Sequence, residues 1–149
     1  MRLPWLLMAL ALLAGVAHAD TRAHEDEEFA RYKQYAGEPI DEFPMFRMWK
    51  WQVVGPERIV IWSTINDAYL VRVEKPCVRL EWTHAVVVTQ KMRQKVSKKF
   101  DYVVFGNQRC KIAEILPVDY KAMLKDGKVN DVGVDASPKA PESQVSGGT

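Results

Sequence analysis

Residues that carry most enzyme and metal chemistry are scarce in this sequence. It holds only 3 histidines and 2 cysteines among 149 residues. The chain has no spacing typical of a zinc or calcium site, a nucleotide-binding glycine loop or a serine nucleophile. The sequence therefore predicts no catalytic residue, no metal site and no cofactor. An enzyme, either a hydrolase or a thiol-dependent one, would have to use His84 or the cysteines, and it stays an alternative.

A strong net charge and a second long apolar run are also missing. The formal net charge of +2 gives no reason to expect a nucleic acid as partner. The one apolar run, residues 3–16, is followed by Ala17-His18-Ala19, the small-x-small pattern that signal peptidase requires. Because this run is short for a membrane span, we interpret residues 1–19 as a signal peptide cleaved after Ala19. The mature chain, with no transmembrane segment, is expected in the periplasm or outside the cell.

Both cysteines, Cys77 and Cys110, lie in the part of the chain that would be exported. In an oxidising compartment a single pair is most simply a disulfide. Closing a loop of this length would stabilise the fold by about 3–4 kcal/mol if chain entropy dominates. A redox pair is the weaker interpretation, because the spacing is not C-x-x-C. A copper site made of Cys77, Cys110, His84 and Met92 is a further alternative whose spacing is not diagnostic.

The distribution of apolar residues predicts one mainly β (α+β) domain with a helix at each end. Residues 20–37 are expected to form the N-terminal helix, since acidic residues precede basic ones and Gly37 suits its end. Residues 38–125 contain short β-branched runs between turn-forming residues, typical of hairpins. We expect a single small antiparallel barrel or roll of about six or seven strands, followed by a short helix through Lys125. Residues 126–149 are expected to form a disordered tail.

Several local patterns refine this prediction. The turn at Gly106-Asn107 places Cys110 opposite Val103 in a hairpin. Trp49 and Trp51 would share one strand face, which we assign to the core rather than to a carbohydrate or aromatic ligand. Residues 77–82 alternate like a strand, although a short helix stays open, and residues 85–89 are typical of a strand covered on both faces. Pro117 is expected to end the last strand and to open the C-terminal helix.

The most basic segment, residues 90–99, is the surface feature that most suggests a ligand. Its cations are Lys91, Arg93, Lys95, Lys98 and Lys99. If strands extend through the segment, it forms a protruding hairpin arm that would contact an anion, such as an envelope polyanion or a lipid head group. The alternative is a solvated tip whose lysines prevent edge-to-edge pairing. Nucleic acid is the weaker partner, because no aromatic residues are interleaved with these charges.

A set of short phrases resembles a known family. They are residues 35–41, Ala68-Tyr69-Leu70, Pro76-Cys77, Phe100-Asp101, Arg109-Cys110-Lys111-Ile112 and Pro117-Val118-Asp119. Over residues 32–120 the chain is similar to a family of small exported proteobacterial proteins with a domain of unknown function. The resemblance implies an exported, mostly β domain with paired cysteines, and neither an activity nor a site residue.

Two functional hypotheses follow, besides the enzyme. The first is a non-enzymatic binding or structural module that meets an unidentified component of the cell envelope. The second is an anion-binding protein that uses the basic arm to hold an anionic polymer or lipid.

Overall fold

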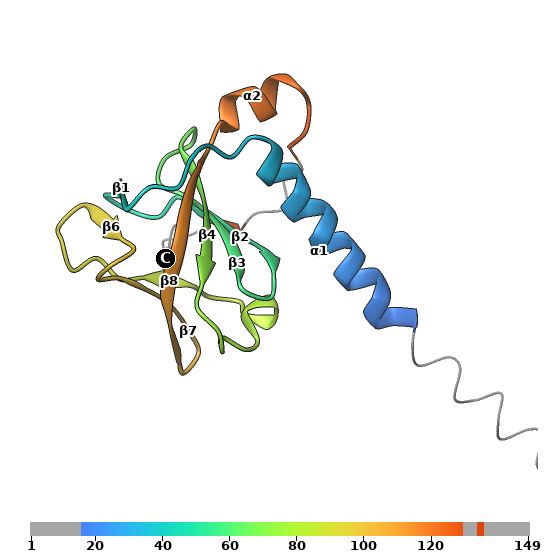
Figure 1. The fold of residues 1–149 in the computed structure, drawn as a ribbon, viewed down its shortest axis with the longest axis horizontal. Coiled ribbons are helices and arrows are strands. Elements are labelled where there is room, and N and C mark those ends of the chain that lie inside the picture. The colour runs from blue at the N-terminus through green and yellow to red at the C-terminus, as the bar shows by residue number, and fades with distance from the viewer. Residues whose placement is uncertain (1–15, 130–133, 136–149) are drawn as a thin grey trace, which may run out of the picture.

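The computed structural model of the protein describes residues 16–129 and 134–135. Figure 1 shows a curled sheet with one helix, α1, running away from it and a short helix, α2, at one end. The elements in chain order are α1 (Val16–Gln34), β1 (Glu42–Pro44), β2 (Lys50–Gly55), β3 (Arg58–Trp62), β4 (Ala68–Val73), the 3₁₀ turn η1 (Leu80–Trp82), β5 (Val87–Val88), β6 (Lys95–Ser97), β7 (Tyr102–Phe105), β8 (Gln108–Val118), α2 (Tyr120–Lys125) and β9 (Val134–Asp135).

Antiparallel pairing builds the sheet, which curls into a half-barrel. Its strand order is β5-β7-β8-β4-β3-β2-β9, and β1 pairs separately with β6 as a two-stranded ribbon. Register shifts at Val53/Gly55 and at Arg72/Val73 mark irregularities of the kind that bends strands. The mainly β fold with a helix near each end is confirmed.

Apolar residues cover both faces of the central strands. On one face, the larger cluster joins residues such as Ile59, Ile61 and Ile112 to Phe43 and Val96 of the ribbon. On the other face, the second cluster packs the helices against the sheet and includes Tyr32, Trp62, Leu70, Leu116, Tyr120 and Met123. This two-sided burial explains why the sequence of β3 is continuously apolar after Arg58.

A disulfide joins Cys77 and Cys110, as expected. The two Cα atoms lie 5.9 Å apart across a sequence separation of 33. Both cysteines are buried in the larger cluster, beside Val103 and Ile112. The Gly106-Asn107 turn sets the predicted register, since Val103 pairs with Cys110. The bond therefore ties the loop after β4 to the longest strand of the sheet.

Helix α1 is held on the sheet by a buried polar network. Tyr32 donates a hydrogen bond to Gln52 Oε1 at 2.8 Å, and Gln52 Nε2 donates to Glu28 Oε2 at 3.1 Å. Arg31 Nη1 lies 2.8 Å from the other oxygen of Glu28. Burial raises the pKa of Tyr32 above its ordinary value of 10.0, so the hydroxyl keeps the proton that it donates.

Strand β8 does not end at Pro117, contrary to the prediction. Strand β8 continues to Val118, and Pro117 pairs with Tyr69 of β4 while its carbonyl accepts a hydrogen bond from Gly37 N. A proline fits this position because only its carbonyl has to form a hydrogen bond there, and no N–H is needed. Asp119, not Pro117, caps α2 by accepting a hydrogen bond from Ala122 N at 3.0 Å.

Two other local predictions are wrong, and a third is decided in favour of its alternative. Trp49 precedes β2 and packs on the helix-side cluster, whereas Trp51 lies in the larger cluster, so the two do not share a face. Residues 77–82 form no strand, and the short helix that was the alternative is present as η1. Residues 85–89 are not covered on both faces, because β5 is an edge strand and Val87 is 61% exposed.

The predicted boundaries fall partly outside the described residues. Helix α1 starts at Val16, before the expected position 20, and residues 1–15 of the predicted signal peptide are not described. Most of the predicted tail, 130–133 and 136–149, also lies outside them. Within that tail, β9 pairs with Lys50 and Trp51 of β2.

Removal of the disulfide should destabilise the fold strongly. The double variant Cys77→Ala/Cys110→Ala is expected to lose about 3–4 kcal/mol of unfolding free energy, because the unfolded chain regains the freedom of the closed loop. Urea unfolding measures this loss. Reduced wild-type protein, which keeps both sulfur atoms, controls for lost packing. Equal urea midpoints for the oxidised and reduced wild type would contradict the expectation.

Candidate functional site

A groove of about 610 Å³ lies between the β1–β6 ribbon and strand β8. We call it the lysine groove, because Lys98 and Lys99, just after β6, and Lys111 on β8 line it. Apolar and acidic residues and one serine complete the lining: Met92, Phe100, Ile112, Ala113, Asp41, Glu42, Glu74 and Ser97. The groove thus brings part of the predicted basic segment against a strand that is distant in sequence.

The basic segment takes its shape from one buried carboxylate, Asp101. This residue is 0% exposed. Its Oδ1 accepts hydrogen bonds from Thr89 Oγ1 and from Lys91 N, each at 2.9 Å, and its Oδ2 accepts one from Ser97 N at 2.8 Å. Three donors satisfy the buried charge, as a carboxylate in this environment requires. The chain between Lys91 and Ser97 must therefore fold back around Asp101.

This fold-back makes the predicted hairpin arm wrong. The segment pairs through β6 with β1, with Val96 opposite Phe43, rather than extending the strands on either side of it. The cations consequently do not line one strand face. Lys98 and Lys99 enter the groove, while Lys91 and Arg93 are exposed on the turn before β6.

Acidic residues next to the ribbon neutralise two of the five predicted cations. Lys95 Nζ lies 2.6 Å from Glu42 Oε1, and Lys98 Nζ lies 2.8 Å from Asp41 Oδ1. The hydrogen bond and charge of Lys98 lower the pKa of Asp41 below its ordinary value of 3.8. Both pairs are substantially exposed, so each contributes little to stability.

Lys99 and two cations outside the basic segment, Arg109 and Lys111, lie near aromatic rings. Arg109 Cζ lies 4.2 Å from the ring centroid of Tyr102, and Lys111 Nζ lies 5.2 Å from the same centroid. Lys99 Nζ lies 5.4 Å from the ring of Phe100, and the carbonyl of Lys99 accepts a hydrogen bond from Lys111 Nζ at 2.7 Å. Within residues 16–129, Lys99, Arg109 and Lys111 form no ion pair. Their charges are available to a ligand.

Sequence reasoning missed Arg109 and Lys111. The sequence pattern that indicates them is Arg109-Cys110-Lys111, in which a buried cysteine separates two cations on a strand. Pairing of Tyr102 with Lys111 across β7 and β8 supplies the aromatic neighbour that the linear sequence lacks. The expectation that aromatic residues and cations are not interleaved therefore holds along the basic segment and fails across the strands.

The residues of the enzyme and copper alternatives do not come together as reactive groups. Cys77 and Cys110 are bonded to each other, so no thiolate is available to either alternative. His84 is exposed in the loop between η1 and β5. Among the described residues, no group of three or more His, Cys, Asp or Glu side chains is placed to hold a metal ion.

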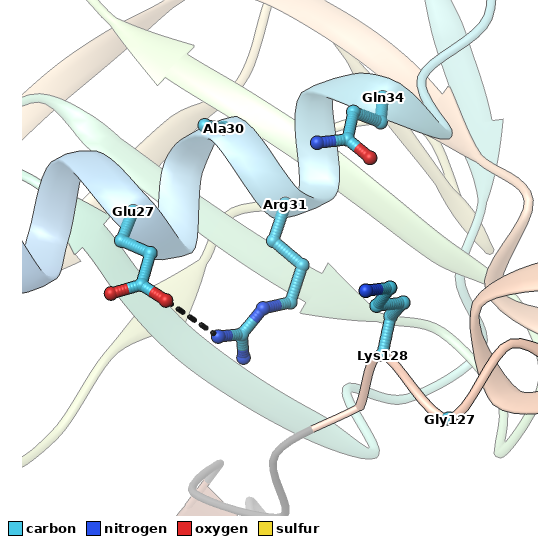
Figure 2. A pocket seen from close by; sticks show the side chains of 6 residues that line it. All are labelled: Glu27, Ala30, Arg31, Gln34, Gly127 and Lys128. Atoms are coloured by element: carbon cyan, nitrogen blue, oxygen red, sulfur yellow. Dashed lines mark ion pairs between the residues drawn. The ribbon is translucent and has the colours of Figure 1, made fainter.

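Two smaller hollows lie along α1. One, of about 300 Å³, separates α1 from Gly127 and Lys128, and Figure 2 shows the ion pair between Arg31 and Glu27, both on α1, with Lys128 on the neighbouring segment. Arg31 is held there by Glu27 and Glu28. The other, of about 200 Å³, contains Arg58, which stacks 4.0 Å from the ring centroid of Phe29. These cations serve helix packing, so we place no ligand in either hollow.

The fold and the groove define a disulfide-bonded, mainly β protein with a surface groove that three lysines and three carboxylates line. The chain belongs to the family described as "Family of unknown function (DUF6491)", which matches residues 1–129. This confirms the resemblance to a family of unknown function. No curated protein and no solved structure is significantly similar to the chain. No helix within the described ranges is long and apolar enough to cross a membrane.

Asp101→Asn should destabilise the basic segment. In the asparagine side chain an NH₂ group replaces one carboxylate oxygen, so a donor that bonded to this oxygen loses its acceptor. This loss should lower the unfolding free energy by about 1–3 kcal/mol. Urea unfolding measures the loss, and faster amide exchange at Lys91 and Ser97 locates it. Asp119→Asn is the matched control, because asparagine caps a helix as well as aspartate does. Equal losses in the two variants would contradict a special role for Asp101.

The Asp41–Lys98 pair predicts a local pH dependence. Because the folded-state pKa of Asp41 is lowered, the pair stabilises the folded protein above the ordinary value of 3.8 and loses this effect as pH falls through the lowered value. Carboxyl ¹³C NMR titration should place the Asp41 pKa below 3.8 in the wild type and near 3.8 in Lys98→Met. Lys121→Met, on α2, should leave it unchanged. A wild-type pKa at 3.8 would exclude the pair in solution.

Proposed function

We propose that this protein is an exported, non-enzymatic binding protein of the cell envelope, and that the lysine groove with Arg109 binds an anionic group of its partner. The observation that carries the proposal is the cluster of Lys99, Arg109 and Lys111, which come from two segments and lack ion pairs in the described part of the chain. Ammonium and guanidinium groups that lack a carboxylate partner suit phosphate or sulfate oxygens.

The position of Lys99 and Lys111 in the groove supports contact with an anion, rather than a solvated tip, as their role. Lysines that only prevent edge pairing would stand on an exposed strand edge. Here, Lys111 lies on β8, an inner strand of the sheet, and its ammonium donates a hydrogen bond to the backbone carbonyl of Lys99, which also lines the groove. This contact fixes the ammonium of Lys111 beside the backbone segment that carries Lys99.

Support for export comes from the sequence and the cysteines. The apolar run and Ala17-His18-Ala19 have the pattern of a cleaved signal. A buried disulfide between the only two cysteines is typical of proteins that fold in an oxidising compartment. Export predicts a mature N-terminus at Asp20, which N-terminal sequencing of the protein recovered from the envelope fraction would check.

A charge-reversal pair tests the anion site. Lys99→Glu/Arg109→Glu changes exposed side chains and should shift elution from heparin to lower salt, with the slope of log affinity against log salt falling by about 2. Lys121→Glu/Lys125→Glu, on α2, makes the same change in net charge away from the groove. The control pair should elute close to the wild type. Identical elution of the two variants would show that net charge, not the groove, determines binding.

A further inference from the structure

We infer that the anionic partner of the lysine groove is the surface of an anionic phospholipid bilayer, on which the protein docks peripherally. The inference rests on the proposed function and goes beyond it by naming the ligand. The observation behind it is that exposed apolar side chains lie next to the cations. A soluble polyanion would make no contact with these apolar side chains.

Two of these side chains line the groove itself. Met92 is 44% exposed and Phe100 is 41% exposed, and both line the groove with Lys98 and Lys99. Single exposed apolar residues are ordinary, but apolar residues that share one groove with lysines form a combined surface. At a bilayer surface, cations contact the phosphates while apolar side chains enter the boundary of the acyl chains.

A third exposed apolar residue lies on the neighbouring turn. Phe46 is 79% exposed and follows Met45. The N–H of Met45 donates to the carbonyl of Gln94 at 2.9 Å, and its carbonyl accepts from Gln90 Nε2 at 2.7 Å. Phe46 is thereby held beside the turn that carries Met92. Figure 1 shows this ribbon on the side of the sheet away from α1, where the helix does not cover it.

The charges around these residues fit an anionic leaflet. Arg47, Lys91 and Arg93 are exposed on the same two turns. Asp41 and Glu42 are paired with Lys98 and Lys95, and Glu74 is the one further carboxylate of the groove lining. The surface therefore presents more unpaired cations than carboxylates next to its apolar residues, which is the combination that peripheral proteins use on anionic membranes.

Vesicle binding with paired variants tests the inference. Wild-type protein should co-sediment with vesicles of phosphatidylglycerol and phosphatidylcholine, and not with vesicles of phosphatidylcholine alone. Met92→Ser/Phe100→Ser should weaken vesicle binding by about tenfold or more and leave heparin retention unchanged. Val78→Ser/Trp82→Ser removes exposed apolar residues from the segment near η1 and should bind vesicles like the wild type. Near-UV circular dichroism confirms that each variant is folded.

The outcomes separate the two proposals. If Met92→Ser/Phe100→Ser binds vesicles as tightly as the wild type, or if the wild type binds heparin but no vesicles, the membrane inference is overturned and the anion site stands. A soluble anionic polymer would then be the partner. If Lys99→Glu/Arg109→Glu retains wild-type binding to both heparin and vesicles, the anion site itself is overturned, and the membrane inference falls with it.

Discussion

The buried carboxylate of Asp101 is the constraint on which the cationic surface depends. A desolvated charge must be satisfied by hydrogen bonds, and the donors that satisfy this one are the backbone of Lys91 and Ser97 and the hydroxyl of Thr89. Once these donors turn inward, the chain between them cannot run on as an extended hairpin. It closes into a turn, and β6 pairs with β1 instead. A single buried negative charge thus positions several exposed positive ones.

Strand β8 joins the stability of the fold to the surface groove. Its alternation sends Cys110 and Ile112 into the larger cluster and leaves Arg109 and Lys111 on the opposite side, next to Tyr102. The disulfide holds the inward residues in register, and that register fixes where the outward cations stand. A slip of one residue would exchange the two sets. The pairing that stabilises the core therefore also determines the geometry of the groove.

Local chemistry made part of this structure predictable. The Gly106-Asn107 turn determines the pairing of Cys110 with Val103 without reference to distant residues, and the apolar run of β3 needs only a covered sheet. The ribbon was not predictable in this way, because Glu42 and Lys95 are separated by 53 positions and no turn connects them. The interleaving of Tyr102 with Arg109 and Lys111 appears only after pairing. The part of the structure that could not be predicted from the sequence is the surface that these long-range pairings produce.

The acidic partners of Lys95 and Lys98 differ from Asp101 in what they do. Asp101 is buried and rigidly bonded, whereas Asp41 and Glu42 stand at the edge of the ribbon with much of their surface in water. A solvent-exposed ion pair contributes little to stability, so it does not hold a lysine against competition from several phosphate oxygens. Under the proposed function, Lys98 exchanges Asp41 for a ligand oxygen, while Asp101 keeps the backbone in place. The same short segment combines a fixed scaffold with side chains that are free to change partners.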